Sequence, residues 1–388
     1  MSGFGFSEEQ EMFRKTMRDF SRKEIAPGAK ERAKQEWQKG TVREWLKRLA
    51  AMDIMGLGVP PEYGGLGADW TTMGIATEEI SKADMNLGAY PTLPALMAKA
   101  MDFGGVPEEI RQRYLPAMCR GELMTCLALT EPNCGSDVAA IQMKAVREGD
   151  YYVLNGEKTS LSGGMEADLA YLFAKTDPKA GARGVTSFLV PLDLPGMTKS
   201  PFSDMGFKNM TRASIFFDNV RVPADHRLSD EGKGFYMVMG TFDVLRVFIG
   251  LSVLGAAQTS IDEAIEYSKQ RTAFGHPIAR YEGVSFKIAE HATKIEAAKL
   301  LCYRTLWLAD QGIVTTKEAA MCKWFCPVVA RDAIHDALII HGHMAYSKEH
   351  PLEQRLRDAI GYELADGTAD IMKLIIAQEL IGKEARPY

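Results

Sequence analysis

The chain has 388 residues, of which 46% are hydrophobic and 25% are charged, as in soluble globular proteins with two or three domains. Its net charge of -5 argues against nucleic acid or an anionic membrane as a partner. Its six cysteines form no Cys-x-x-Cys pair, so we expect reduced thiols and no metal site.

Residues 1–120 have the apolar spacing of helices. Ser7-Glu8-Glu9-Gln10 is a capping-box sequence that predicts a helix start, and Pro60 to Gly67 has the composition of a loop. Met1 to Gly5 lacks the features of a secretory or transit leader, so we expect a cytoplasmic protein. The longest apolar stretch, Val247 to Ala257, is too short to predict a membrane span.

Residues 121–230 have the pattern of a β-domain. Tyr151 to Leu154 and Glu157 to Thr159 flank Asn155-Gly156, which predicts a hairpin with a type I′ turn. Further strands are predicted at Leu169 to Ala174, Thr186 to Val190 and Ser214 to Val222.

Residues 231–388 return to the helical period. The predicted helices are Phe235 to Arg271, Val284 to Gln311, Thr316 to Met344 and Ala369 to Lys383. The order is therefore helical, then β, then helical. We predict an α+β fold of three domains, at residues 1–120, 121–230 and 231–388.

A short turn precedes the last predicted helix. Thr368 suits a helix N-cap, and Gly367 allows the chain to turn into it. Asp366 then lies next to a helix N-terminus, whose partial positive charge favours its ionised form. Such a carboxylate can be a general base, or it can be an ordinary turn residue. The four residues from Ala365 leave both readings open.

Two other stretches have residue types suited to phosphate or flavin. Thr130 and the Gly135-Ser136-Asp137 turn could place hydroxyl and backbone N–H groups against a phosphate. Arg271 could contact a phosphate with two hydrogen bonds, and Phe274 could cover a planar ring. Each stretch alone is more often structural.

Together these stretches resemble the acyl-CoA dehydrogenase family, and the resemblance runs the whole length of the chain. It rests on Phe6 to Gln10, Pro61 to Gly67, Leu129 to Pro132 with Gly135 to Asp137, Arg271-x-x-Phe274-Gly275, and Asp366-Gly367-Thr368. It implies an N-terminal helical domain, a middle β-barrel domain and a C-terminal four-helix bundle. It also implies a homotetramer built as a dimer of dimers.

The resemblance implies FAD as cofactor, an acyl-CoA as substrate and an electron-transferring flavoprotein as electron acceptor. The residues implied for FAD are Leu129, Thr130, Ser136, Ser162, Arg271, Phe274 and Thr368. Those implied for the substrate and its CoA are Ser136, Asp243, Arg246, Ala365 and Gly367.

Asp366 takes the place of the catalytic glutamate of the family, and Ala365 stands where relatives often have tyrosine. The shorter base and the small neighbour favour a bulky or cyclic acyl group, with cyclohexanecarboxyl-CoA as the leading substrate. Leu245 occupies the position of the base in the isovaleryl and long-chain branches, so that alternative base is absent.

Other readings stay open at this point. The chain could be a flavin oxidase of the same fold, acting on a nitroalkane or an acyl-CoA, or a non-catalytic relative that binds CoA thioesters. The direction of the reaction is also open. Ser160 replaces a tryptophan that commonly packs on the flavin, and His341 and His343 interrupt a second family signature.

Overall fold

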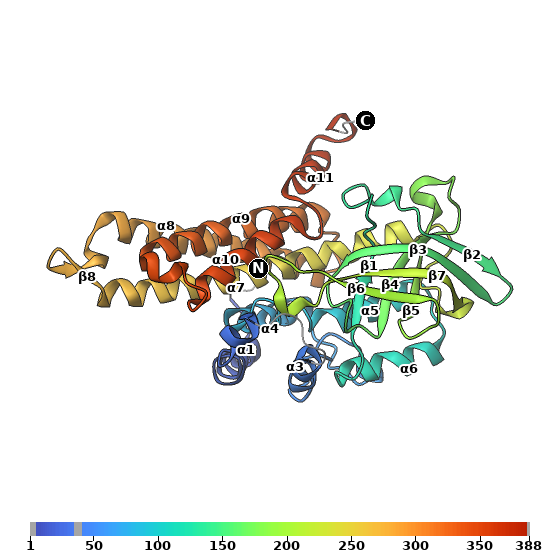
Figure 1. Cartoon of the computed structure of the whole chain (residues 1–388), viewed down its shortest axis with the longest axis horizontal. Helices are drawn as coiled ribbons and strands as arrows, with labels where there is room; N and C mark the ends of the chain where they lie inside the picture. The colour runs from blue at the N-terminus through green and yellow to red at the C-terminus, as the bar shows by residue number, and fades with distance from the viewer. Residues whose placement is uncertain (1–4, 35–40, 386–388) are drawn as a thin grey trace. The chain divides into compact units, whose positions relative to one another are not determined.

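The computed structural model describes residues 5–34 and 41–385 (Figure 1). Met1 to Phe4, on which the cytoplasmic expectation partly depends, lie outside the described residues. The chain divides into two compact units. The first contains residues up to 35, 69–89 and 243–388, and the second contains residues 36–68 and 90–242. Each unit thus takes part of the N-terminal helical segment.

The second unit is built on a seven-stranded sheet. Its strands are β1 (Thr125–Ala128), β2 (Lys144–Glu148), β3 (Tyr151–Leu161), β4 (Leu169–Lys175), β5 (Val185–Pro191), β6 (Met197–Pro201) and β7 (Ala213–Pro223). They pair in the order β1-β4-β2-β3-β7-β6, and β5 pairs antiparallel with β4 along its whole length. The buried apolar side chains of the sheet, among them Tyr152, Leu172 and Phe188, form one core. Helices α3 (Thr41–Ala50), α5 (Thr92–Phe103) and α6 (Glu108–Cys119) belong to the same unit.

The predicted hairpin at Asn155-Gly156 is wrong. Residues 151–161 form one continuous strand, β3, which pairs with β2 on one side and β7 on the other. Gly156 marks an irregularity in the β3–β7 register, and its φ of 145° is accessible to glycine. A Cβ at this position would lie 2.9 Å from Met143 Cγ. The glycine therefore serves a bulge and a close approach, two roles that resemble a turn signal in the sequence.

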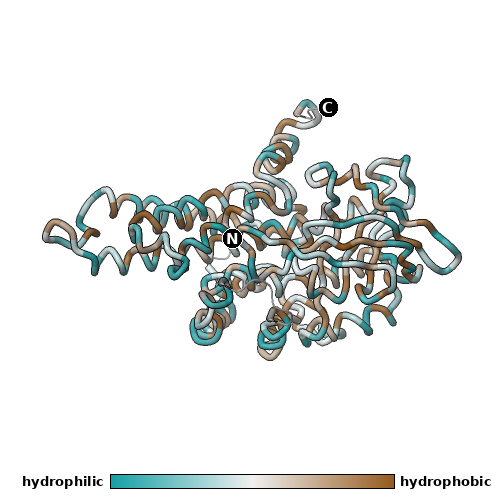
Figure 2. The backbone as a smooth tube through the Cα atoms, viewed as in Figure 1, coloured by the Kyte–Doolittle hydropathy of each residue, from teal (hydrophilic) through white to brown (hydrophobic). Residues whose placement is uncertain are grey.

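The first unit is helical. It contains α1 (Glu8–Phe20), α2 (Ala29–Lys34), α4 (Trp70–Ala83), most of α7 (Gly234–Gln270), α8 (Glu282–Asp310), α9 (Thr316–His341), α10 (Pro351–Leu364) and α11 (Ala369–Ile381). The predicted capping box is confirmed, because Ser7 and Gln10 exchange side-chain-to-backbone bonds of 3.1 Å. Helix α10 was not predicted, so the Asp366 turn lies between α10 and α11. Figure 2 shows hydrophobic residues recurring along the helices and strands.

Helix α7 agrees to within one residue at each end with the helix predicted from Phe235 to Arg271. Over its 37 residues it is apolar enough to cross a membrane by length and composition alone. However, 72% of its most apolar window is buried inside the protein, as in the core helices of soluble proteins. All six cysteines are free thiols and are buried.

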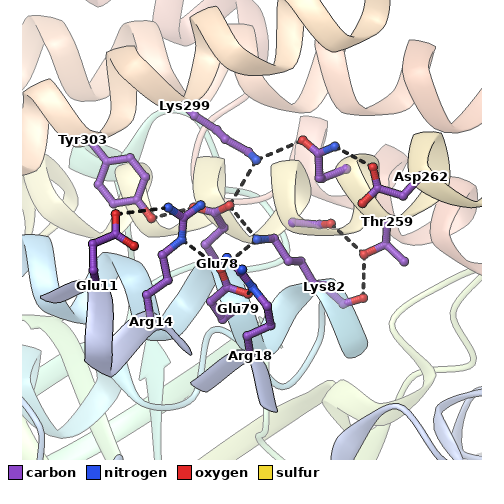
Figure 3. A network of polar contacts seen from close by, with 12 residues as sticks. Glu11, Arg14, Arg18, Glu78, Glu79, Lys82, Thr259, Asp262, Lys299 and Tyr303 are labelled. Atoms are coloured by element: carbon purple, nitrogen blue, oxygen red, sulfur yellow. Dashed lines mark hydrogen bonds and ion pairs between the residues drawn. The ribbon is translucent and has the colours of Figure 1, made fainter. Parts of the chain in front are cut away.

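Two glutamates of α4 form the centre of a charged network in the first unit (Figure 3). Glu78 accepts a 2.6 Å bond from the Tyr303 hydroxyl and pairs with Lys82 and Lys299, each at 3.1 Å. Burial raises the pKa of Glu78, but Lys299, Lys82 and the Tyr303 hydrogen bond together lower it to about 2. Glu79 pairs with cations from two helices: Arg14 and Arg18 of α1, and Lys82 of α4.

Candidate functional site

The Asp366 turn joins α10 to α11. Thr368 is the N-cap of α11, with its hydroxyl accepting the Ile371 N–H at 3.4 Å, so the predicted cap is confirmed. The chain turns through two left-handed residues, Asp366 at φ 53° and Gly367 at φ 102°. A Cβ at position 367 would lie 2.5 Å from the end of Met372. Glycine is favoured next to the carboxylate mainly by its left-handed conformation, because the flexible end of Met372 can move away from a Cβ.

Two buried cations from other helices contact this turn. Lys323 of α9 is 1% exposed, and its Nζ donates to the carbonyl oxygens of Tyr362 at 2.7 Å and Gly367 at 3.1 Å. Arg246 of α7 is 5% exposed, and its Nε lies 3.5 Å from the carbonyl oxygen of Asp366. Within the described residues, no hydrogen bond or ion pair involves the carboxylate oxygens of Asp366. The turn is thus held through its backbone.

The electrostatics of Asp366 differ from the sequence expectation. Desolvation raises the pKa of its carboxyl group, while Lys323 and Arg246 act in the opposite direction without cancelling that effect. The pKa is therefore raised above its ordinary value, the reverse of what a helix N-terminus alone predicts. A carboxylate with a raised pKa is a stronger proton acceptor once ionised, which suits a general base.

The other residues predicted for substrate take different positions. Arg246 and Gly367 meet at the turn, where a Cβ on residue 367 would lie 3.7 Å from the guanidinium. Asp243 accepts the Thr316 hydroxyl at 2.9 Å with its side chain and the Thr315 hydroxyl at 3.2 Å with its carbonyl, so it anchors the start of α9. Ala365 is the C-cap of α10 and is partly exposed.

In the second unit, a buried ion pair fixes the loop that follows β1. Lys158 is fully buried, and its Nζ donates to the Leu129 carbonyl at 2.9 Å and to Glu131 at 2.7 Å. Glu131 also accepts the backbone N–H groups of Gln142 and Met143. Burial lowers the pKa of Lys158 to about 8, with Glu131 acting in the opposite direction. The sequence pattern did not indicate this pair, because it placed Lys158 in a local hairpin and gave no sign of its distant partner.

The loop and the end of β3 present hydroxyl groups suited to a cofactor. The Thr130 carbonyl accepts the Thr159 N–H at 2.9 Å, which joins the two segments. Ser136 and Ser162 are exposed, Thr130 is partly exposed, and none of the three side chains hydrogen-bonds to another described residue. Such hydroxyls on a fixed backbone fit the many acceptor atoms of a flavin dinucleotide. Ser160, with φ 61°, is exposed beside them.

Arg271 and Phe274 lie far from the Asp366 turn. Arg271 directly follows α7, 25 residues after Arg246, and Phe274 lies between β8 (Thr272–Ala273) and β9 (His276–Pro277), in the hairpin labelled β8 in Figure 1. Twenty-five residues of helix correspond to roughly 37 Å. Phe274 is 93% exposed at φ 50°, and Arg271 is exposed. Within one chain these two residues and Asp366 do not form one site.

Other candidate polar residues have structural partners. His341 is buried, is 2.8 Å from the Ala337 carbonyl through Nδ1, and stacks on Tyr267 with ring centroids 4.5 Å apart. Asp84 pairs with Arg32 at 3.1 Å. Among the described residues, no group of three His, Cys, Asp or Glu side chains is arranged to hold a metal ion.

Comparison with known protein families gives matches along almost the whole chain. Three family profiles match: the acyl-CoA dehydrogenase N-terminal domain at residues 7–122, the middle domain at 126–220 and the C-terminal domain at 232–381.

Two curated relatives and one solved structure illustrate the likeness. The chain is 38% identical to a 3-(aryl)acrylate reductase of Clostridium sporogenes, over 97% of this chain and 99% of that protein. It is 34% identical to the caffeyl-CoA reductase-Etf complex subunit CarC of Acetobacterium woodii, over 97% of this chain and 100% of that subunit. Butyryl-CoA dehydrogenase from Megasphaera elsdenii superposes with a TM-score of 0.92 at 32% identity, covering 98% of this chain and 100% of that one.

The three profiles agree with the order of helical, β and helical segments along the chain. The chain belongs to the acyl-CoA dehydrogenase family, FAD-dependent oxidoreductases that act on the CH–CH bond of acyl-CoA thioesters.

Proposed function

We propose that Asp366 is the base that removes the α-proton of an acyl-CoA thioester in an FAD-dependent α,β-dehydrogenation. The observation that carries this proposal is the Asp366 turn: a carboxylate without a partner among the described residues, on a backbone held by Lys323 and Arg246. The α-proton goes to this carboxylate, and the β-hydrogen leaves as hydride. FAD, when bound, supplies the hydride acceptor at N5.

We infer that backbone and hydroxyl groups of this chain orient the cofactor. Leu129 and Thr130 would contact the flavin ring, and Ser162 would offer its hydroxyl near N5. Ser136 would face the pyrophosphate of FAD or the CoA, and Thr368 would face the FAD phosphates. Their support is the loop held by Lys158 and the exposed hydroxyls described above. Asp243 and Arg246 would line the path of the CoA.

We propose a bulky or cyclic acyl group as the substrate, with cyclohexanecarboxyl-CoA as the leading candidate. The aspartate is one methylene shorter than a glutamate, and the side chain of Ala365 is a single methyl group. The names of two relatives point the same way, because aryl-acrylate and caffeyl groups both carry a ring. Those names also favour a second candidate, the reduction of a ring-bearing 2-enoyl thioester by the same site running in reverse.

We propose an electron-transferring flavoprotein as the redox partner and a cytoplasmic homotetramer as the working form. The relative that is named as a subunit of an Etf complex supports the partner. Exposed apolar side chains on the C-terminal helices support subunit contacts: Leu300, Trp307, Ile339, Leu380 and Ile381. The exposed Arg271 and Phe274 would reach the FAD of a neighbouring subunit.

The test is anaerobic bleaching of the bound FAD by a panel of acyl-CoAs. The panel contains cyclohexanecarboxyl-CoA, 3-phenylpropanoyl-CoA, butyryl-CoA and octanoyl-CoA. We expect a ring-bearing thioester to reduce the flavin fastest. Faster reduction by butyryl- or octanoyl-CoA would contradict the substrate proposal, and no reduction by any thioester would contradict the dehydrogenase proposal. Rapid reoxidation of the reduced enzyme by air would indicate an oxidase.

A further inference from the structure

A buried lysine supports the backbone of the base turn from a different helix. Lys323 lies on α9, while its two acceptors lie on either side of Asp366: Tyr362 in the last turn of α10 and Gly367 just before α11. One ammonium group therefore ties the end of one helix to the start of the next. The base is carried by the four residues between these two contacts.

Stability alone does not account for a lysine at this position. A buried ammonium group loses its hydration, and an apolar side chain of similar volume generally avoids that cost. Burial lowers the pKa of Lys323 to about 8, with Asp366 the first of the groups that act in the opposite direction. The charge is thus retained at an electrostatic cost, beside the one carboxylate that the proposed reaction needs.

The backbone conformation gives this lysine a defined task. The backbone of Asp366 is in the left-handed helical region, a conformation that a residue with a Cβ adopts at an energetic cost. The carbonyls of Asp366 and Gly367 are held by Arg246 and Lys323. These contacts offset that cost and fix the direction in which the carboxylate leaves the backbone.

The other charged groups that act on Asp366 or Lys323 also interact with partners of their own. Arg246 is the second cation that acts on Asp366, and it also interacts with Asp243. Glu363, the other carboxylate that acts on Lys323, pairs with Arg331 at 2.8 Å. The thiol of Cys326 also faces Lys323 but is buried, which raises its own pKa.

We propose that Lys323 is a positioning residue for Asp366: it fixes the backbone from Tyr362 to Gly367 and keeps a positive charge beside the base. This inference rests on the proposed role of Asp366. It predicts two separate consequences of losing Lys323. The carboxylate is misplaced, which lowers the rate, and it ionises at a higher pH, which moves the pH profile.

The experiment uses the FAD-loaded protein and three variants that separate the two effects. Lys323→Met removes both charge and donors, Lys323→Gln keeps donors only, and Lys323→Arg keeps both. Lys299→Met is the matched control, because it removes a buried lysine of the Glu78 network. The primary readout is the rate of anaerobic FAD reduction by the fastest acyl-CoA, measured across pH, together with the FAD content.

We expect Lys323→Met to lower the maximal rate by at least 10-fold, with a smaller change in the half-saturating acyl-CoA concentration. We also expect the acidic limb of the profile to move up by about one pH unit, since Asp366 must be ionised to accept a proton. Lys323→Gln should shift the acidic limb of the pH profile as far as Lys323→Met does, but with a smaller loss of rate. Lys323→Arg should keep the acidic limb of the wild type. Lys299→Met should lower stability and leave the limb in place.

The inference would be overturned if Lys323→Met folds, contains FAD, and shows both the maximal rate and the acidic limb of the pH profile of the wild type. If that variant does not fold, the same result in Lys323→Gln would overturn it. A second readout does not depend on activity. It is the change in unfolding free energy caused by Asp366→Asn, measured as a function of pH. The inflection of this curve should lie at a higher pH when Asp366→Asn is made in Lys323→Gln than when it is made in the wild type. This arm still tests Lys323 if no acyl-CoA reduces the wild-type flavin, an outcome that contradicts the proposed function alone.

Discussion

Two carboxylates in the helical unit each face two cations, with opposite results. At Glu78, Lys82 and Lys299 contact the carboxylate itself at 3.1 Å, and the pKa falls to about 2. At Asp366, Lys323 and Arg246 contact backbone carbonyls instead, and the pKa is raised by desolvation. The position of the cations therefore decides whether a desolvated carboxylate is fixed as an anion or remains able to take up a proton.

The largest effect is expected at the network of Figure 3. Glu78→Gln leaves the buried Lys299 without its carboxylate, while Lys82 loses one of two ion pairs and keeps Glu79. We expect a loss of roughly 3–5 kcal/mol in the free energy of unfolding. The measurement is chemical denaturation at pH 7. Glu11→Gln is the control, because that side chain is 55% exposed and should change stability by less than about 0.5 kcal/mol. Equal effects of the two substitutions would remove the distinction between this network and ordinary surface charge.

The pH dependence of stability should reveal the same carboxylate. Because the folded pKa of Glu78 is about 2 against an ordinary 4.5, its contribution is complete above about pH 5 and is lost as the pH falls towards 2. By linkage this amounts to about 3 kcal/mol. The stability difference between wild type and Glu78→Gln should therefore shrink as the pH falls from 5 to 3. A difference that stays constant over that range would contradict the lowered pKa.

Gly367→Ala tests the turn itself. We expect a loss of about 1–2 kcal/mol, because alanine is strained at φ 102°, and the new Cβ must displace the end of Met372. FAD reduction should slow as the carboxylate shifts. Gly240→Ala is the matched control, since a Cβ at that α7 position meets no atom within 4 Å and alanine favours the helix. A stabilising effect of Gly367→Ala would show that the turn is not strained.

The smallest effect should have the opposite sign to that of Glu78→Gln. Since the folded pKa of Asp366 is raised, ionisation of this group costs stability at neutral pH. Asparagine removes the charge and tolerates the left-handed backbone. Asp366→Asn should therefore raise the free energy of unfolding at pH 7 by up to about 1 kcal/mol. A loss of more than about 1 kcal/mol would place Asp366 with Glu78 as a structural anion.

Local signals in the sequence predicted much of the fold. Thr368 as a cap, Ser7 with Gln10 as a capping box, and the buried strand from Leu169 depend on neighbouring residues, and all three are confirmed. The order of helical and β segments is equally visible, because the apolar period changes from helix to strand. Asp366 was found by its motif.

The charge partners of the site could not be predicted, because they come from distant segments. Lys323 reaches Gly367 across 44 residues, and Lys158 reaches Glu131 across 27. In the sequence, each is a lysine within an ordinary helix or strand pattern. The raised pKa of Asp366 also depends on desolvation, which a local rule about helix termini does not include.

The most direct test of the central claim is stopped-flow reduction of the bound FAD by saturating acyl-CoA in Asp366→Asn. We expect that FAD stays bound and that the reduction rate falls by about 10²–10⁴-fold, the contribution of a positioned general base. Asp366→Glu, which keeps a carboxylate, should retain part of the rate. An Asp366→Asn protein that binds FAD and is reduced at the wild-type rate would contradict the assignment of Asp366 as the base.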